Sequence, residues 1–438
     1  MIMAMIRLET EMRDAGIDWI GNIPKNWNIK PLYACLDEIK QKNSPVVTTN
    51  ILSLTNTDGV IPYSERGNQG NKSKENFEEY KVVYPNTIVA NSMNILIGSV
   101  GLSKYEGCVS PVYYVYMAKP QVDIRYMNYL FQMEPFQKRL RQFANGILEI
   151  RLRVSSHDIL HQKVAVPDYD EQQAIADYLD KTCSKIDKII AEAKASIDEY
   201  KELKQSVIFE AVTKGLDKNV EMKNSGYDFI GCIPSEWEMF KVRHLGTAQN
   251  GLIICGDAFG SGHPFVSYGD VYKNYSLPKT VDKLVQFSEE DRKRYSVEKG
   301  DWFFTRTSET IEEVGFSCVC EETIPDAVFA GFLIRVRPFN NRIYTGFAKY
   351  YFRSNHLRTF FVKEMNLVTR ASLAQGLLKD APVVVPPYDE QIEIANYLEN
   401  KCEIIDGVIK DKESTINDLE AYKKSLIYEV VTGKRRVI

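Results

Sequence analysis

The sequence has few residues of the kinds that hold a metal ion. Five histidines occur among 438 residues, none in an HExxH arrangement, and the eight cysteines are scattered without a CxxC pair. The closest pair, Cys318 and Cys320, skips one residue, which suits the alternating faces of a strand better than a tetrahedral site. We therefore expect neither a metal site nor a disulfide scaffold.

Long apolar stretches are also missing. No uncharged apolar run approaches the roughly 18–20 residues that cross a bilayer, and Met1–Arg7 is not followed by a signal-peptide pattern. With 44% hydrophobic and 26% charged residues, the composition is typical of a soluble globular protein. We expect a cytoplasmic protein of two or three domains that has no membrane partner.

Motifs of nucleotide-binding and methyl-transferring enzymes are absent. No GxxxxGK[ST] segment occurs, and the glycines of Phe259–Gly262 and Gly98–Gly101 have the wrong spacing or length for a cofactor loop. Val385–Tyr388 (VPPY) resembles the NPPY motif of amino-methyltransferases, but valine cannot accept a hydrogen bond from an exocyclic amine as asparagine does. We therefore expect a chain that is not an enzyme and has no catalytic residues.

An internal repeat organises what is present. Gly16–Trp27 (GIDWIGNIPKNW) recurs 210 residues later as Gly226–Trp237 (GYDFIGCIPSEW). Pro167–Gln172 (PDYDEQ) recurs 219 residues later as PPYDEQ. The chain is therefore predicted to contain two copies of one unit, each opening with the first motif and closing with a long segment that begins at YDEQ.

The two closing segments are predicted to be long helices. Their apolar residues recur mostly in alternating steps of four and three, which is typical of a coiled coil. Asp170 and Asp389 lie where N-caps are expected, and Gly215 and Gly433 lie where helices stop. A helix of about 44 residues needs a partner, and the economical one is its own duplicate, antiparallel about a pseudo-twofold axis. The predicted seam is Ile175, Leu179, Ile186, Ile189, Ala193, Ile197, Tyr200, Leu203, Val207 and Ala211, then Ile394, Leu398, Ile405, Val408, Ile416, Leu419, Tyr422, Leu426 and Val430.

The segments between these motifs are predicted to mix α and β structure, so the fold class is α+β. In both copies, β-rich runs bounded by Gly, Pro and Asn precede a helical pattern. A polar linker, Gly215–Ser225, joins the copies. The predicted elements are strands at 45–54, 81–90, 95–100 and 109–116 with a helix at 126–143, then strands at 265–268, 302–305, 315–320 and 328–336 with a helix at 346–361.

Basic residues concentrate late in each copy. A charged helix face is more often simply solvated, but the recurrence at equivalent places favours nucleic-acid binding, in which Lys and Arg neutralise phosphates. Although the net charge of −4 argues weakly against a general polyanion binder, this local pattern points to DNA or RNA. The residues are Lys138, Arg139, Arg141, Arg151 and Arg153 in the first copy, and Arg335, Arg337, Arg342, Arg353, Arg358, Lys363 and Arg370 in the second.

These features together resemble the specificity subunit of type I restriction-modification systems. Two copies of G-x-D-x-I-G-x-I-P-x-x-W each lead to P-x-x-[DE]-E-Q and a helix ending in V-T-x-G or V-T-G, across essentially the whole chain. The resemblance implies two target recognition domains, each reading one half of a bipartite DNA sequence, separated by two antiparallel coiled-coil helices. It implies a first recognition domain at 1–169 and a first spacer helix at 170–214. The linker and the second recognition domain would then occupy 215–388, and the second spacer helix 389–438.

The resemblance also implies partners and cofactors. Two methyltransferase subunits would dock on this chain and use S-adenosylmethionine to methylate adenine in double-stranded DNA. Two restriction subunits, attached through the methyltransferases, would use ATP and Mg²⁺ to translocate and cleave unmodified DNA. This chain would hold no cofactor itself.

Site residues follow from the same resemblance. Contact with DNA is implied for the turn after the first-copy strand 87–90 and for its counterpart after the strand 302–305, with Arg151 and Arg370 as clamps on the DNA backbone. The turn residues are Asn91 and Ser92, and Arg306, Thr307 and Ser308. The implied partner-docking residues are Asp170, Glu171, Gln172, Tyr178 and Leu179, and Asp389, Glu390, Gln391, Tyr397 and Leu398.

Two other classes of protein stay open at this point. A self-sufficient methyltransferase would need a cofactor loop, and turnover by the isolated chain would favour it. A purely structural coiled-coil scaffold would show no DNA preference, so equal binding to all duplexes in the presence of a partner would favour that alternative.

Overall fold

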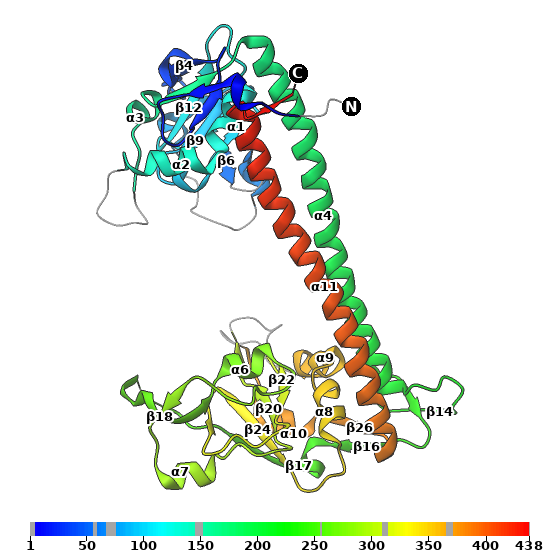
Figure 1. The fold of residues 1–438 in the computed structure, drawn as a ribbon. Helices are drawn as coiled ribbons and strands as arrows, with labels where there is room; N and C mark the ends of the chain where they lie inside the picture. Colours follow the sequence, from blue (N-terminus) through cyan, green and yellow to red (C-terminus); the bar gives the residue numbers. More distant parts are fainter. Residues whose placement is uncertain are drawn as a thin grey trace. The chain divides into compact units, whose positions relative to one another are not determined.

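The computed structural model describes residues 5–55, 59–66, 76–144, 152–254, 256–308, 314–364 and 371–437. The chain forms two compact units, Met1–Ala193 with Glu413–Ile438, and Lys194–Lys412. Each unit contains one globular domain and part of each of two long helices, α4 (Tyr169–Lys214) and α11 (Tyr388–Val431) (Figure 1). In the described part of the chain, no helix is long and apolar enough to span a membrane.

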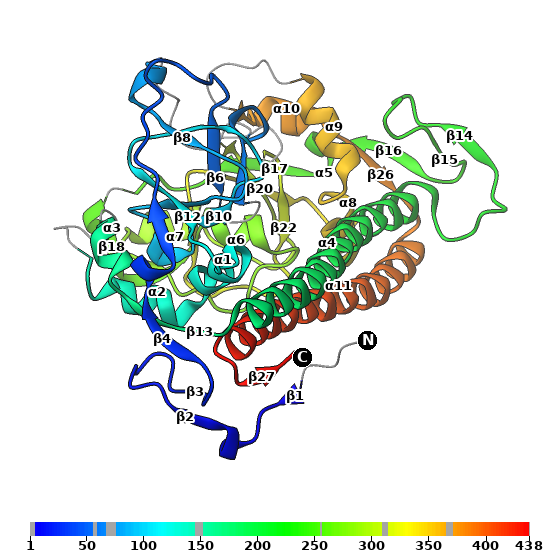
Figure 2. The same ribbon diagram turned by 90° about the horizontal axis from the view of Figure 1, so that it is seen from above.

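The two long helices run antiparallel in each unit (Figures 1 and 2). In the first unit Lys423 Nζ lies 2.6 Å from Asp187 Oδ1, and in the second unit Lys204 Nζ lies 2.7 Å from Asp406 Oδ2. The two lysines are 219 residues apart in the sequence, and so are the two aspartates. The two ion pairs are therefore equivalent in the two copies. The predicted antiparallel pair with internal pseudo-twofold symmetry is confirmed.

The buried seam differs from the prediction at several positions. Ile190 and Ile208 are buried, whereas Ile189 and Leu203 on α4 and Tyr422 on α11 are about half exposed. An α-helix has 3.6 residues per turn, so a seam extrapolated with a 3.5-residue period drifts off the apolar face. Ile175, Leu179, Ile186, Ile394, Leu398 and Ile405 are buried as predicted.

The starts of the long helices also correct the prediction. Helix α4 begins at Tyr169, and its N-cap is Asp168, whose Oδ1 accepts a hydrogen bond from Glu171 N at 2.8 Å. Helix α11 begins at Tyr388, directly after Pro387, so Asp170 and Asp389 lie inside the first turn. Both predicted stop residues are confirmed, because Gly215 and Gly433 have φ of 77° and 74°, the left-handed region that favours glycine.

The inter-helix ion pairs give a first prediction. Asp187→Lys or Lys423→Asp alone should lower the free energy of unfolding by about 0.2–1 kcal/mol. The double variant, in which the two charges are exchanged, should regain most of this loss. Chemical denaturation of the four proteins of this cycle measures the coupling. Lys188→Asp, beside the pair on an exposed face of α4, is the matched control and should change stability by less than about 0.5 kcal/mol. Single changes that simply add would show that the pair does not stabilise the antiparallel register.

The first domain is built on a four-stranded antiparallel sheet in the order β10-β9-β12-β5. Smaller two-stranded sheets surround it, and helices α1 (Ile124–Gln132) and α2 (Glu134–Arg141) follow. The predicted helix 126–143 is thus two helices, broken at Met133, because Pro135 cannot continue a helix. The strands of this domain are β2 (Met12–Asp14), β3 (Asn22–Pro24), β4 (Asn28–Pro31), β5 (Leu36–Glu38), β6 (Leu52–Thr55), β7 (Gly59–Pro62), β8 (Lys81–Val83), β9 (Ile88–Asn91), β10 (Val100–Leu102), β11 (Gly107–Val109), β12 (Tyr113–Ala118) and β13 (Lys163–Val166).

The second domain repeats this plan with the sheet β17-β24-β20-β22 and a further sheet, β19-β18-β23. Part of the predicted linker is ordered, because β14 pairs with β15. In the first domain, the predicted strand 95–100 instead begins as a 3-10 turn, Ile95–Ile97. The second-domain elements are β14 (Met222–Asn224), β15 (Cys232–Pro234), β16 (Glu238–Lys241), α5 (Val242–Leu245), β17 (Gly246–Asn250), β18 (Phe259–Val266), α6 (Tyr268–Lys273), β19 (Leu284–Val285), α7 (Glu289–Arg294), β20 (Trp302–Thr305), β21 (Thr307–Ser308), β22 (Ser317–Val319), β23 (Val328–Phe329), β24 (Leu333–Pro338), α8 (Thr345–Tyr351), α9 (Asn355–Glu364), β25 (Ala371–Ser372), α10 (Gln375–Asp380) and β26 (Pro382–Val385).

The two ends of the chain meet in the first unit. Strand β1 (Met5–Ile6) pairs antiparallel with β27 (Arg435–Arg436), and Arg7 N donates to Lys434 O at 3.0 Å. The N-terminal segment is thereby held against the end of α11 (Figure 1).

Candidate nucleic-acid interface

The two repeated motifs bind each other inside each unit. The indole N–H of Trp27 donates to Glu171 Oε2 at 2.9 Å, and that of Trp237 donates to Glu390 Oε2 at 2.8 Å. Both tryptophans are buried, and Arg7 also bonds to Glu171. Burial raises the pKa of the Glu390 carboxyl, and the Trp237 N–H partly offsets this rise because it stabilises the carboxylate. In each copy, the tryptophan that ends the first motif is hydrogen-bonded to the glutamate of the YDEQ motif. This bond gives a structural reason for the two motifs to occur together.

The glutamine of each YDEQ motif fixes the domain to its long helix. Gln172 Oε1 accepts from Asp123 N at 3.0 Å, and Gln391 Oε1 accepts from Tyr344 N at 2.7 Å. Asp123 and Tyr344 are the N-caps of α1 and α8, so each glutamine satisfies a helix-start amide in its own domain. Both glutamines are fully buried.

A tyrosine on the same domain helix makes a second contact with the long helix. Tyr129 on α1 donates to Asp180 Oδ1 at 2.8 Å, and Tyr350 on α8 donates to Glu399 Oε2 at 2.7 Å. Burial is the largest cause that raises the pKa of both phenols, so each stays a hydrogen-bond donor at neutral pH. Sequence reasoning missed these contacts, although the two acids lie 219 residues apart and could have signalled them.

The predicted partner-docking residues therefore divide into two sets. Glu171, Gln172, Leu179, Gln391 and Leu398 are buried in this chain, and Glu390 is half-buried. Asp170, Asp389 and Tyr397 are exposed, and Tyr178 is half-buried. The exposed residues and the half-buried Glu390 and Tyr178 present surface that another subunit could reach, so for these residues docking stays a prediction.

In the first domain, the predicted DNA-contacting turn lies beside the segment that carries Arg153. Ser92 O accepts a hydrogen bond from Val154 N at 3.1 Å, which places Arg153 next to the end of β9. Arg153 is exposed, whereas Asn91 and Ser92 are buried and Asn91 Oδ1 accepts from Met93 N. Arg153 is thus the accessible cation at this edge; Arg151 lies outside the described residues.

The second domain repeats this arrangement. Arg306 O accepts from Leu373 N at 2.7 Å, and β21 pairs with β25 through Thr307 and Ser372. Arg306 and Thr307 are half-exposed, and no described residue bonds to the Arg306 guanidinium. Arg370 lies outside the described residues, two positions before Ser372. In both domains, therefore, the strand-end turn meets the segment that was predicted to carry the DNA clamp.

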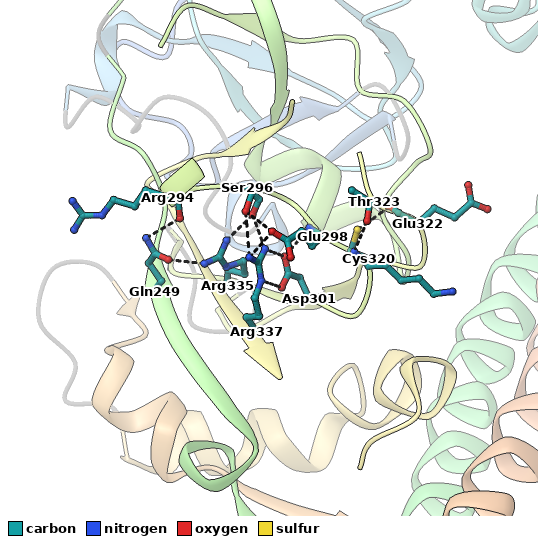
Figure 3. A network of polar contacts seen from close by, with 11 residues as sticks. Gln249, Arg294, Ser296, Glu298, Asp301, Cys320, Glu322, Thr323, Arg335 and Arg337 are labelled. Carbon is teal, nitrogen blue, oxygen red and sulfur yellow. Dashed lines mark hydrogen bonds and ion pairs between the residues drawn. The ribbon is translucent and has the colours of Figure 1, made fainter. Parts of the chain in front are cut away.

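Most of the other predicted basic residues of the second domain have internal partners. Arg337 binds both oxygens of Asp301 at 2.7 Å, and Arg335 donates to Gln249 Oε1 at 2.6 Å (Figure 3). Arg353 donates to four backbone carbonyls and stacks over Phe316 at 4.3 Å, and burial lowers its pKa. Their first role is to hold the domain together.

The basic residues of α2 are more accessible. Lys138 and Arg141 are exposed, although Lys138 pairs with Glu134 at 2.7 Å. Arg139 is half-buried, bonds to Gln162 at 3.2 Å and stacks over Phe143. No group of three or more His, Cys, Asp or Glu side chains in the described residues could hold a metal ion.

Comparison with known proteins gives the family. The family model for the type I restriction modification DNA specificity domain matches residues 24–199 and 234–417. Since the two matches cover most of the chain and follow its two copies, the chain belongs to this family of type I restriction-modification specificity subunits, which recognise DNA sequence and are not catalytic.

The relatives share the architecture at low identity. The type I restriction enzyme MjaVIII specificity subunit of Methanocaldococcus jannaschii is 21% identical over 426 residues, covering 95% of this chain and 94% of the relative. The EcoKI specificity subunit of Escherichia coli K12 is 21% identical over 315 residues, 68% and 63% of the two chains. Among solved structures, a chain of a type I R-M system superposes with a TM-score of 0.71 at 13% identity, covering 94% of this chain and 99% of its own length. The HsdS subunit of Thermoanaerobacter tengcongensis gives a TM-score of 0.51 at 14% identity, covering 94% and 98%.

Proposed function

We propose that this specificity subunit reads a bipartite double-stranded DNA target, one half-site per domain, in a cytoplasmic complex. In this proposal it docks two methyltransferase subunits and, through them, two restriction subunits. S-adenosylmethionine, ATP and Mg²⁺ belong to those partners, so this chain contributes only sequence recognition and assembly.

The observation that carries the DNA-reading proposal is a pair of equivalent surface edges. Each domain brings the turn after its central strand, β9 or β20, together with the segment that follows the domain helices. Arg153 is accessible at the first edge and Arg306 at the second. Accessible arginines suit phosphate and guanine recognition because the guanidinium offers a planar fork of donors.

The long helices support docking of two like partners. Exposed apolar side chains remain on them after the helices pair, Ile189 and Tyr422 in the first unit and Leu203 and Ile404 in the second. Tyr422 and Leu203 lie at equivalent places in the two copies. An exposed apolar side chain at the same place on each unit, as at Tyr422 and Leu203, fits one copy of the same partner on each unit.

The two arginines give a prediction that tests DNA reading. In the complex with the methyltransferase, Arg306→Ala should relax only the half-site read by the second domain, by about 1–3 kcal/mol if the guanidinium makes a bidentate base contact. Arg153→Ala should weaken binding to all sequences alike and lower the salt slope by about one, as loss of a phosphate contact does. Binding of duplexes substituted base by base, at several salt concentrations, measures both effects.

Arg292→Ala is the matched control in the second domain. This arginine is engaged by Glu289 and Asp326 at a different edge, and its loss should leave both half-sites intact. Simultaneous relaxation of both half-sites by Arg306→Ala in a folded complex would contradict independent reading by the two domains. Equal binding of all duplexes by the unaltered complex would contradict DNA reading itself.

A further inference from the structure

Two large apolar side chains stand out of the surface beside Arg306. Phe332 is 64% exposed and Ile253 is 83% exposed. A Cβ at Gly331 would lie 2.9 Å from Ile253 Cγ1, so the glycine lets Ile253 lie against the backbone that carries Phe332. Gly331 N also donates to Leu252 O at 2.8 Å, so the two exposed side chains stand on neighbouring stretches of backbone, and we call them the apolar projection.

Phe332 lies directly across from Arg306. Thr305 pairs with Leu333 at the end of the β20–β24 ladder, and beyond this pair Arg306 N donates to Phe332 O at 2.9 Å. Phe332 belongs to the turn that leads into β24, and this hydrogen bond brings its backbone into direct contact with that of Arg306. The apolar projection and the accessible guanidinium thus occupy one edge of the second domain.

At the equivalent place, the described residues of the first domain have no such projection. Tyr113 pairs with Asn91 as Leu333 pairs with Thr305, so the counterpart of Phe332 is Val112, a smaller and half-buried side chain. Its neighbour is Pro111 where the second domain has Gly331. A feature needed for folding or for docking two like partners would be expected in both copies, whereas one that reads a particular half-site is expected in a single copy.

We propose that Phe332, with Ile253 beside it, makes an apolar contact with a base in the half-site read by the second domain, and so helps to determine specificity together with Arg306. The inference rests on the proposed function. DNA offers an apolar base surface in two ways. One is the C5-methyl group of thymine in the major groove, and the other is the face of a base exposed when a side chain wedges into a base step. The guanidinium next to the apolar pair favours DNA over an apolar protein surface, since it supplies the charge that attracts phosphate or guanine.

The test compares two phenylalanines at opposite ends of one strand. Phe332 precedes β24 and Phe339 follows it, and Phe339 is 62% exposed. In complexes of the full chain with its methyltransferase, Phe332→Ala should bind the cognate duplex about tenfold more weakly and lose discrimination at a position of the second half-site. The first half-site and the salt slope should be unchanged, because no charge is removed. Ile253→Ala should change the same position by a smaller factor, and Phe339→Ala should match the unaltered complex.

Two modified duplexes identify the base surface that is contacted. Replacing each thymine of the second half-site with uracil removes only the methyl group, so weaker binding by the unaltered complex but not by Phe332→Ala identifies a methyl contact. In the second duplex, 2-aminopurine replaces a base of the second half-site, and its fluorescence rises when it is unstacked. A rise in the unaltered complex but not in Phe332→Ala identifies a wedge. Either result supports the proposal.

Three results would overturn it. In the first, Phe332→Ala has the same affinity and discrimination as Phe339→Ala at every position of the target. In the second, neither modified duplex gives different results for Phe332→Ala and for the unaltered complex. Alternatively, folded Phe332→Ala chain could fail to assemble with the methyltransferase, which would assign the projection to a protein partner. A complex that shows no sequence preference before any substitution refutes the proposed function instead, and this outcome is distinct because it does not depend on Phe332.

Discussion

Replacing Trp237 with alanine is expected to lower the free energy of unfolding by about 3–5 kcal/mol. The indole is buried beneath the start of α11, and its N–H is bonded to Glu390, so the change leaves both a cavity and a half-buried carboxyl that has lost its donor. Chemical denaturation of the chain in its complex measures the loss. A decrease below about 1 kcal/mol would show that the contact between the two motifs does not hold the domain to the helix.

Trp237→Phe separates the hydrogen bond from the packing. Burial raises the pKa of Glu390, and loss of the N–H should raise this pKa further. A carboxyl whose pKa is raised in the folded state binds its proton more tightly there than in the unfolded chain. Stability is therefore lost as the pH rises from the unfolded pKa through the folded pKa, and more is lost in Trp237→Phe. The variant should thus fall further below the unaltered chain at neutral than at acidic pH.

Glu390→Gln provides the control for that pH dependence, because a neutral amide does not titrate in this range. In the Glu390→Gln background, Trp237→Phe should cost the same unfolding free energy at both pH values. A pH-dependent difference that persists in this background would assign it to another group.

The architecture could be predicted because repetition is visible in the sequence. The 219-residue spacing of PDYDEQ and PPYDEQ identified two helices of equal role. Their apolar period predicted that they pair, and the alternation of globular unit and helix along the chain predicted the antiparallel direction. The structure adds that Asp187 with Lys423 and Asp406 with Lys204 obey the same spacing. The register of the pair was therefore present in the sequence, but charged residues on a helix surface are too common to single out without knowing which face is buried.

The site was harder to predict because burial decides what a polar residue does. Gln172 and Gln391 were expected to face a partner, yet they satisfy helix-start amides of their own domains. Arg353 and Arg335 were counted as basic surface, yet their long side chains reach inward to carbonyl and amide oxygens. One-dimensional spacing identifies residues with a shared role but cannot tell an internal hydrogen bond from an external one.

Local propensity also failed where tertiary contacts or a single residue overrode it. The apolar run 95–100 has the composition of a strand, but it opens with a 3-10 turn that ends at Gly98, whose φ of 86° no strand adopts. The helix pattern 126–143 is continuous in its apolar period, yet the chain breaks at Met133 and a second helix begins at Glu134 with Pro135 in its first turn. Phe332 and Ile253 were not singled out, since exposed apolar residues cannot be distinguished from core residues before the sheet register is known.

Adding one heptad to each long helix, after Ala193 and after Lys412, is expected to lengthen the unspecified gap in the DNA target by up to about three base pairs. Both insertions fall at the division between the two compact units, so neither domain should be disturbed. Seven residues preserve the apolar seam and add about 10 Å at 1.5 Å per residue, and DNA advances about 3.4 Å per base pair. Sequencing of methylated sites in a host that carries the lengthened chain measures the gap.

The same experiment distinguishes a measuring role of the helices from a docking role. A step of three base pairs also rotates one half-site by roughly 100° about the duplex, because a turn takes about 10–10.5 base pairs, and DNA twist can absorb part of the added length. The half-site sequences should stay the same, since Arg306, Arg153 and their surroundings are untouched. Inserting one heptad in α4 alone is the control. The two helices would then differ in length between the units, so the registers marked by Lys204 with Asp406 and by Asp187 with Lys423 could not both be kept, and the chain should be destabilised. If sites with the original gap are methylated at full occupancy in a host that carries the doubly lengthened chain, the helices dock partners but do not set the distance between half-sites.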